Sequence, residues 1–248
     1  MRKILEVCVD SFASARAAIR GGADRLELCS ALSIGGLTPY SALLEQIRSE
    51  SDIPVRCLMR PRAGDFLYTS EEILQMARDI EILKKAGASG FVIGCLTPDG
   101  DLDITAMSTL LEAAEGTGLT LHRCIDVSRD LKQTYLDAGN LCIDTVLTSG
   151  GAGNCRAGMD TIGQLLQLQE DGGPEVLIGA GVNASVIEIF RSRFPAACAF
   201  HMSGKTEIES GMRFRREGIP MGIPGFDEWH IQQTSEEAVK AARFALDK

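Results

Sequence analysis

Two short apolar segments near the N-terminus each contain one glutamate, Glu6 in the first and Glu27 in the second. Because side chains alternate along a strand, Glu6 shares a face with Cys8, and Glu27 shares a face with Cys29. A carboxylate in an apolar strand costs free energy unless it is paired or takes part in chemistry. We therefore expect these two glutamates to be general acids or bases, with a structural ion pair to an arginine as the alternative.

Two histidines end other apolar segments. His122 is followed four residues later by Asp126, and the two side chains share a face if the strand continues that far. His201 ends the last apolar segment. A histidine held by a carboxylate is a general acid or base that works near neutral pH. The candidate catalytic residues are Glu6, Glu27, His122, Asp126 and His201.

Arginine, aspartate and serine supply candidate substrate-binding groups. Arg60, Arg62 and Asp65 follow directly after a third strand. Guanidinium groups bind carboxylates, phosphates and hydroxyls through paired donors, so these residues predict a polar or anionic ligand. A solvated loop of charges is the alternative. Arg123, next to His122, and Ser149, in a run of small residues, complete the predicted binding set.

The segments that carry these residues alternate with helical patterns. We expect strands over Leu5–Val9, Arg25–Leu28, Val55–Met59, Phe91–Ile93, Leu119–His122, Thr145–Leu147, Val176–Ile178 and Cys198–Met202. The intervening segments mostly have helical periodicity, for example Glu71–Lys85. Strands that alternate with helices about every thirty residues indicate parallel pairing with right-handed crossovers.

Eight such units in 248 residues favour a (β/α)8 TIM barrel, with parallel strands and outer helices, as a single domain over residues 1–248. An open doubly wound sheet is the alternative. Active sites of barrels lie at the carboxyl ends of the strands, which is where the polar residues fall.

Two glycine-containing motifs have simpler explanations than nucleotide binding. Residues 179–184 (GAGVNA) resemble a dinucleotide fingerprint, but no acidic residue ends the next strand, so a loop after strand seven fits better. Residues 203–206 (SGKT) resemble the end of a P-loop, but the first required glycine would be residue 199, which is alanine.

Composition excludes several classes of partner and site. The net charge of −9 repels phosphate backbones and anionic lipids, so we expect neither nucleic acid nor membrane as a partner. The N-terminus lacks the pattern of a secretory signal peptide. The eight cysteines form no CxxC pair, which indicates free thiols in a reducing cytoplasm and argues against a zinc finger.

Several of the segments together resemble the CutC, or copper homeostasis, family. The matching stretches, in chain order, are residues 6–11 (EVCVDS), 21–29 (GGADRLELC), 35–39 (GGLTP), 60–68 (RPRAGDFLY), 96–100 (LTPDG), 122–123 (HR), 147–150 (LTSG) and 201–204 (HMSG). They extend from the first strand to the last. The chain departs from the family pattern at Ala63, where the family often has glycine, and at Cys124 and Ile125, where it often has Ala-Phe.

The resemblance implies a cytoplasmic (β/α)8 barrel that forms homodimers or larger homo-oligomers and has a role in copper homeostasis. It also implies Cu(I) as a ligand, with Cys8 and Cys29 as the candidate metal residues. Cu(I) prefers thiolate and thioether donors. Cys57, Cys95 and Cys124 are further thiols near strand ends.

Three classes of function therefore remain open. The thiols favour copper binding. The carboxylates, histidines and arginines favour an enzyme that uses acid/base chemistry on a polar, carbohydrate-like or anionic small molecule. The same carboxylates and histidines leave a hard divalent metal open as a further ligand. A long irregular segment, residues 203–233, favours a scaffold or interaction role, with Met212–Pro224 as a dimer surface.

Overall fold

The computed structural model describes residues 3–216, 218–219, 221 and 227–248. Eight parallel strands close into a barrel in chain order, so the predicted TIM barrel is confirmed and the open sheet is excluded. The strands are β1 (Ile4–Val9), β2 (Arg25–Leu28), β3 (Val55–Leu58), β4 (Gly90–Ile93), β5 (Gly118–Leu121), β6 (Thr145–Thr148), β7 (Glu175–Ile178) and β8 (Ala199–Met202). Each predicted strand overlaps one of these.

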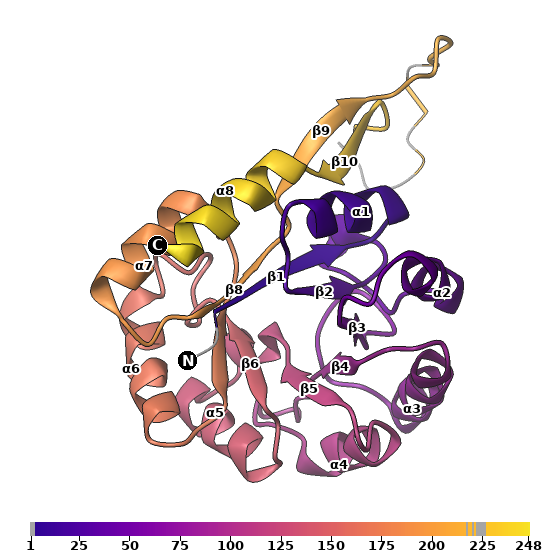
Figure 1. Ribbon diagram of the computed structural model, residues 1–248. Coiled ribbons are helices and arrows are strands. Elements are labelled where there is room, and N and C mark those ends of the chain that lie inside the picture. The colour runs from indigo at the N-terminus through magenta and orange to yellow at the C-terminus, as the bar shows by residue number, and fades with distance from the viewer. Residues whose placement is uncertain (1–2, 217, 220, 222–226) are drawn as a thin grey trace.

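Helices form the outer ring of the barrel (Figure 1). They are α1 (Phe12–Arg20), α2 (Ser41–Glu50), α3 (Ser70–Lys85), α4 (Ile104–Ala113), α5 (Leu131–Asn140), α6 (Met159–Glu170), α7 (Ala184–Arg193) and α8 (Glu236–Asp247), with short 3-10 helices η1 (Leu32–Ile34) and η2 (Arg123–Val127). In the described part of the chain, no helix has the length and apolar character needed to span a bilayer.

Alternation along the strands separates an apolar layer from a polar interior. Leu5, Val7 and Val9 of β1 are fully buried in the main hydrophobic cluster, which joins the strands to the helices. Glu6 and Cys8 have the opposite orientation and contribute to the polar interior of the barrel. Alternation therefore places the chemistry-bearing residues of β1 inside the barrel, as the sequence predicts.

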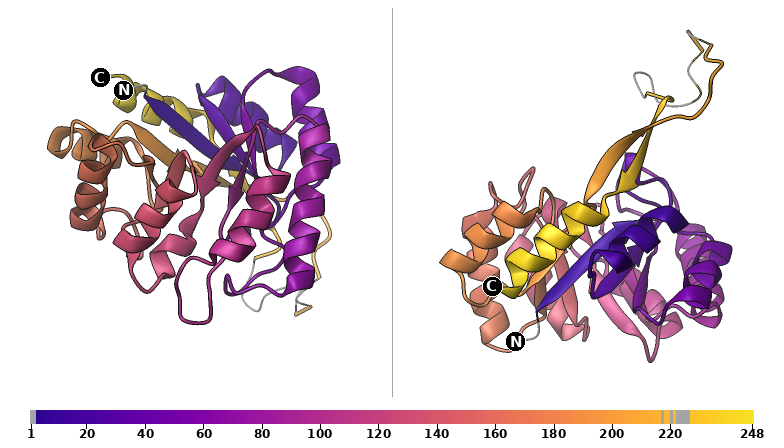
Figure 2. Two further views of the ribbon diagram at one scale, coloured as in Figure 1. Left: turned by 90° about the horizontal axis from the view of Figure 1, so that it is seen from below. Right: turned by 45° about the horizontal axis from the view of Figure 1, so that its top comes forward.

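Beyond β8 the chain leaves the barrel as an antiparallel hairpin, β9 (Lys205–Glu209) paired with β10 (His230–Thr234). The hairpin projects away from the barrel (Figure 2), and we call residues 205–234 the arm. The arm covers most of the irregular segment predicted at residues 203–233 and ends one residue beyond it, at Thr234. Of the predicted dimer surface at 212–224, residues 217, 220 and 222–226 lie outside the described residues.

Candidate active site

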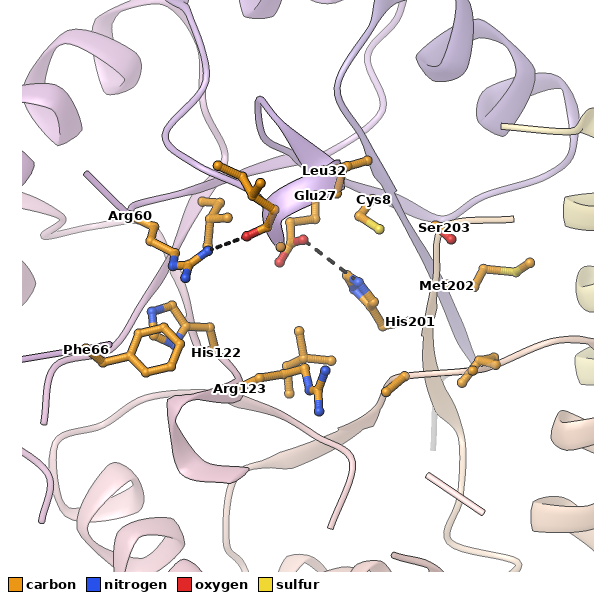
Figure 3. A pocket seen from close by; sticks show the side chains of 17 residues that line it. Cys8, Glu27, Leu32, Arg60, Phe66, His122, Arg123, His201, Met202 and Ser203 are labelled. Carbon is orange, nitrogen blue, oxygen red and sulfur yellow. Dashed lines mark hydrogen bonds and ion pairs between the residues drawn. The ribbon is translucent and has the colours of Figure 1, made fainter. Parts of the chain in front are cut away.

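A pocket of about 390 Å³ opens at the carboxyl ends of the strands. Figure 3 shows two groups of side chains facing each other across it: Arg60, Phe66 and His122 on one side, and Cys8, Glu27 and His201 on the other. The complete lining is Cys8, Glu27, Leu32, Ile34, Gly35, Leu58, Arg60, Phe66, His122, Arg123, Leu147, Ala180, Gly181, Val182, His201, Met202 and Ser203.

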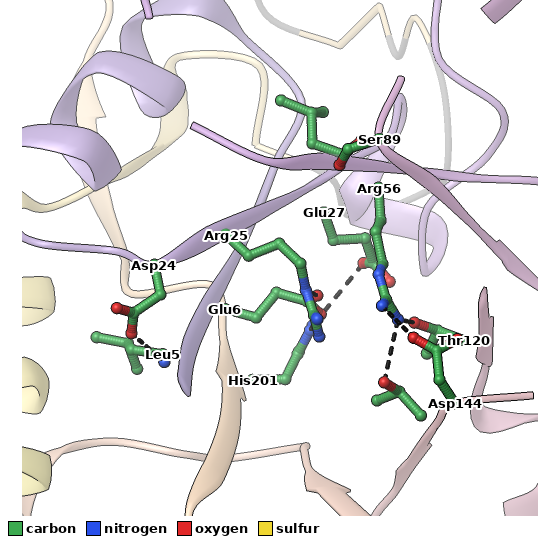
Figure 4. Close-up of polar contacts among 12 residues, drawn as sticks. Leu5, Glu6, Asp24, Arg25, Glu27, Arg56, Ser89, Thr120, Asp144 and His201 are labelled. Atoms are coloured by element: carbon green, nitrogen blue, oxygen red, sulfur yellow. Dashed lines mark hydrogen bonds and ion pairs between the residues drawn. The ribbon is translucent and has the colours of Figure 1, made fainter. Parts of the chain in front are cut away.

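Beneath the pocket, Glu6 joins two cations from the neighbouring strands (Figure 4). In the strand register, Glu6 stands opposite Arg25 of β2 on one side and His201 of β8 on the other. One carboxylate oxygen accepts from Arg25 Nε, and the other lies 2.8 Å from His201 Nδ1. Burial raises the pKa of Glu6, but the two cations outweigh it and hold that pKa at about 2. Glu6 does not line the pocket, so its geometry is that of a structural ion pair, the alternative considered from the sequence.

Glu27, Cys8 and His201 meet at the pocket wall. Their ligand atoms lie within 4.8 Å of one another, and His201 Nε2 is 3.8 Å from Glu27 Oε2. Burial raises the pKa of Glu27 to about 7, although His201 opposes the rise. Burial also opposes a charge on His201, but Cys8, Glu27 and Glu6 outweigh it and raise the pKa of the imidazole well above its usual range. Glu27 is therefore a carboxyl group that can gain or lose a proton near neutral pH.

Arg60 is a buried guanidinium with carbonyl partners only. Nη1 donates to the carbonyls of Ile34 (3.1 Å) and Gly36 (3.0 Å), and Nη2 donates to that of Gly64 (2.9 Å). Nε has no partner, and no acidic side chain of the described residues forms an ion pair with the group. The charge of Arg60 is thus available to an anion in the pocket.

His122 is a neutral imidazole. Its Nδ1 accepts a hydrogen bond from the Cys124 amide at 3.1 Å, while its buried Nε2 has no partner. Burial, and then the charge of Arg60, lower the pKa of His122 to about 3. The Phe66 ring packs against the imidazole with centroids 4.8 Å apart. Since Nδ1 is an acceptor, the single proton of the neutral ring is on Nε2, at the pocket.

The predicted pairing of His122 with Asp126 is wrong, because β5 ends at Leu121 and the chain turns into η2. Asp126 instead accepts from the Thr148 hydroxyl at 2.6 Å and from the backbone amide of Ser149 at 3.0 Å. Arg123 Nε donates to the same carboxylate at 2.7 Å. Asp126 and Ser149 therefore fix the loop after β6 and position Arg123, and of the three only Arg123 lines the pocket.

Arg62 and Asp65 lie beside the pocket rather than in its wall. Arg62 Nε donates to Glu72 at 2.6 Å, and Arg62 Nη1 is 3.0 Å from Asp65. The side chains of Arg62 and Asp65 are both exposed to solvent. The two residues therefore fit the alternative considered from the sequence, a solvated loop of charges. Of the two arginines that follow β3, only Arg60 faces the ligand space.

The thiols do not gather at the pocket. The Cys29 thiol donates to the Val9 carbonyl at 3.5 Å and packs against Leu58 and Val92. Cys57, Cys95 and Cys124 belong to the main hydrophobic cluster. Of the two predicted metal ligands, only Cys8 shares a group with other ligand-type side chains, and its partners there are Glu27 and His201 rather than Cys29.

Several pocket residues were not predicted, because they come from loops without periodic patterns. Phe66 lies within one of the family-like segments, but its aromatic side chain was not singled out. The loop that follows β7 contributes Ala180, whose φ of 69° is in the left-handed region that favours glycine. That unusual conformation is visible only in the folded chain.

The comparisons with known proteins agree on one family. The model of the CutC family matches residues 3–206. The chain is 39% identical to a family protein CutC of Chromobacterium violaceum, over all of both chains, and 40% identical to one of Porphyromonas gingivalis, over 96% of each.

Solved structures share the barrel. The CutC crystal structure from Streptococcus agalactiae, whose name refers to copper homeostasis, has a TM-score of 0.76 at 24% identity and covers 81% of this chain and 98% of that one. A 2,3-dimethylmalate lyase has a TM-score of 0.56 at 17% identity, over 82% and 76% of the chains. Both structural likenesses concern the fold alone.

Proposed function

The chain belongs to the CutC family, and from that premise we propose that it is an enzyme that uses acid/base chemistry on a small anionic molecule in the pocket. One observation carries the proposal. A buried arginine without an acidic partner among the described residues shares the pocket with a buried carboxyl group, and the arginine comes from the loop after β3 while the carboxyl group comes from β2. Convergence of an anchoring cation and a proton-transfer group in one cavity is typical of active sites.

Each side of the pocket has its own task. Arg60 binds the anionic group of the ligand, and Arg123 also lines the pocket. Glu27 exchanges a proton with the reacting atoms, since its pKa of about 7 keeps both protonation states populated near neutral pH. His201 remains a cation beside Glu27 and keeps that carboxyl group in place. Glu6 holds His201 from below.

The test is calorimetric titration with a panel of small carboxylates and phosphate esters, followed by activity measurements on those that bind. We expect R60Q to weaken binding of the best ligand by roughly 10- to 100-fold, because a charge-assisted hydrogen bond is lost. E27Q should bind that ligand within a few-fold of wild type but lose about 100-fold or more in turnover.

R62Q is the matched control, because Arg62 follows the same strand but pairs with Glu72 outside the pocket. Its affinity should equal that of wild type. R60K keeps the positive charge, so it should bind the ligand better than R60Q. Such a difference would show that R60Q loses affinity because the charge is gone and not because the chain is unfolded. Equal affinities of R60Q and wild type for every ligand would refute the proposal.

Copper binding is the second candidate, and the convergence of Cys8, Glu27 and His201 favours it, together with the names of relatives. A thiolate and an imidazole are acceptable Cu(I) donors, but a carboxylate is a hard donor that Cu(I) does not prefer. Cys29 is the second soft donor that the sequence predicts, but its thiol donates a hydrogen bond to the Val9 carbonyl. The donor set therefore fits Cu(I) poorly, and the pocket favours the enzyme.

Cu(I) titration against a competing chelator distinguishes the two candidates. We expect C8S and C29S to compete for Cu(I) no less well than wild type. A stoichiometric Cu(I) site in wild type that C8S abolishes and C29S leaves intact would instead support copper as the ligand.

The free thiols also support action in a reducing compartment, and we propose the cytoplasm.

We further propose that the chain forms homo-oligomers through the arm. Its exposed apolar side chains include Ile208, Phe214 and Ile231. Exposed apolar side chains grouped on a projecting segment are typical of a surface that contacts another protein molecule, here a second copy of the chain.

A further inference from the structure

The side of the pocket opposite Glu27 contains a donor that the proposed function does not yet use. The imidazole Nε2 of His122 is buried and has no hydrogen-bond partner among the described residues. An unpaired N–H in a protein interior costs free energy, so its retention requires an explanation. His122 lines the pocket, and a bound ligand can supply the missing acceptor.

The surroundings of His122 fix which proton it offers. The Cys124 amide donates a hydrogen bond to Nδ1. The lone pair of Nδ1 therefore points at the amide, and Nδ1 carries no proton. Gly94 approaches the ring at Cε1 and Nδ1, where a Cβ would lie only 2.5 Å and 2.6 Å away. The Phe66 ring covers one face. The ring is therefore held in one orientation, with Nε2–H as its only donor.

Arg60 stands on the same side of the pocket and also packs against Phe66, with its guanidinium carbon 5.4 Å from the ring centroid. The pocket thus presents a fixed cation and a fixed neutral donor together. A neutral N–H matches a carbonyl oxygen better than a full anion, whereas the guanidinium matches a carboxylate or phosphate.

We propose that the substrate is a carbonyl compound with an anionic group, in which Arg60 binds the anion and His122 Nε2–H donates to the carbonyl oxygen while Glu27 removes a proton from the adjacent carbon. This inference rests on the proposed acid/base function and names its substrate class. A carboxylate base opposite a neutral imidazole donor is an arrangement that stabilises an enolate.

The step is balanced without an oxidant or a metal. The Glu27 carboxylate takes a proton from the carbon next to the carbonyl group, and the electron pair of that C–H bond forms a C=C bond. The π electrons of the carbonyl group move to its oxygen, where His122 Nε2–H stabilises the developing negative charge. The proton on Glu27 exchanges with solvent before Glu27 returns a proton to the same carbon, so the net reaction is exchange of that proton.

The first measurement is the protonation of His122 in the whole protein, read from long-range ¹H–¹⁵N spectra of ¹⁵N-histidine-labelled chain. The sequence has only three histidines, so each gives its own pattern, and the H122Q spectrum assigns one of them. Between about pH 6 and pH 8 we expect His122 to remain neutral with its proton on Nε2. A proton on Nδ1, or an imidazolium in that range, would overturn the inference.

The second measurement uses pyruvate and propionate as probes, which are both carboxylates but differ in the carbonyl group. Pyruvate should shift the His122 Nε2–H signal and bind roughly 10-fold more tightly than propionate. H122F keeps an aromatic ring and should abolish the preference, whereas H122Q, which keeps an N–H donor, should retain part of it. In D₂O, wild type should exchange the methyl protons of pyruvate, and E27Q should not.

The outcomes separate the two proposals. Pyruvate that binds without shifting His122, or without exchanging its methyl protons, overturns this inference and leaves the anion-binding function intact. If neither probe binds wild type, while His122 is neutral as expected, the substrate class is wrong, and the panel of anions described above then decides the proposed function separately.

Discussion

At the scale of single residues, pairing with an opposite charge decides which charged side chains are structural and which can contact a ligand. Glu6 and Glu27 each lie in an apolar strand, but the register sets Glu6 opposite Arg25 and Glu27 opposite Cys8. Glu6 is therefore paired on both sides, whereas Glu27 faces the pocket. The same contrast separates Arg60 from Arg62. The residue types were evident from the sequence, but the pairing depends on the strand register.

Removal of the Glu6 charge is expected to destabilise the fold. E6Q leaves Arg25 and His201 buried without their carboxylate, and breaking a buried pair costs about 3–5 kcal/mol. Chemical denaturation monitored by circular dichroism measures the change. The control E188Q removes a surface pair with Lys248 and should change the free energy of unfolding by less than about 1 kcal/mol. Equal effects of the two variants would contradict the buried network.

Glu27 should make the fold less stable as the pH rises. Its pKa is about 7 in the folded chain against 4.5 as the ordinary value, so the folded state binds more protons between those values and stability falls from pH 4.5 to pH 7. The full shift corresponds to roughly 3 kcal/mol. E27Q, which stays neutral, should flatten this part of the curve when the free energy of unfolding is measured at several pH values. A curve with the slope of wild type would show that Glu27 has no raised pKa.

At the scale of elements, loop and strand glycines decide how closely side chains approach the site. Gly94, directly after β4, leaves room for His122 and Cys124. In α3 the sequence is more informative, because Met76, Ile80 and Leu83 share one face at helical spacing and all three are buried. Periodic elements are therefore predictable, whereas close approach between loops is not.

G94A should disturb the His122 side of the pocket. The added methyl group would lie 2.4 Å from Cys124 Sγ and 2.5 Å from His122 Cε1, and overpacking of this kind costs about 1–3 kcal/mol. Thermal denaturation measures the loss, and the histidine spectra should show a displaced His122 signal. G153A is the control, because its Cβ would meet no atom within 4 Å. If G94A is as stable as G153A and His122 is unmoved, the packing described around that ring is wrong.

At the scale of the whole molecule, the barrel and the arm differ in what covers their apolar surface. The barrel strands are sealed by the helices, whereas Phe214 and Ile231 of the arm are 66% and 55% exposed. We propose that these exposed side chains of the arm contact a second copy of the chain.

The arm should govern the oligomeric state. We expect the triple variant I208S/F214S/I231S to be monomeric at concentrations where wild type forms a larger species, as measured by size-exclusion chromatography with light scattering. The control L74S/V127S replaces exposed apolar residues on the barrel and should not change the mass. A triple variant with the mass of wild type would exclude the arm as the contact between copies.

The sequence by itself determined the barrel, because period-two strands, amphipathic helices and their repetition leave few other packings. It also identified Glu27, Arg60, His122 and His201 as polar groups at strand ends. Only the tertiary structure decided which of these residues contact one another. Glu6 lies between Arg25 and His201, and Asp126 is bonded to the loop after β6 rather than to His122. Cys29 lies apart from the group formed by Cys8, Glu27 and His201. These relations depend on barrel closure, strand register and the end of β5 at Leu121, which join residues far apart in the chain and have no local signal.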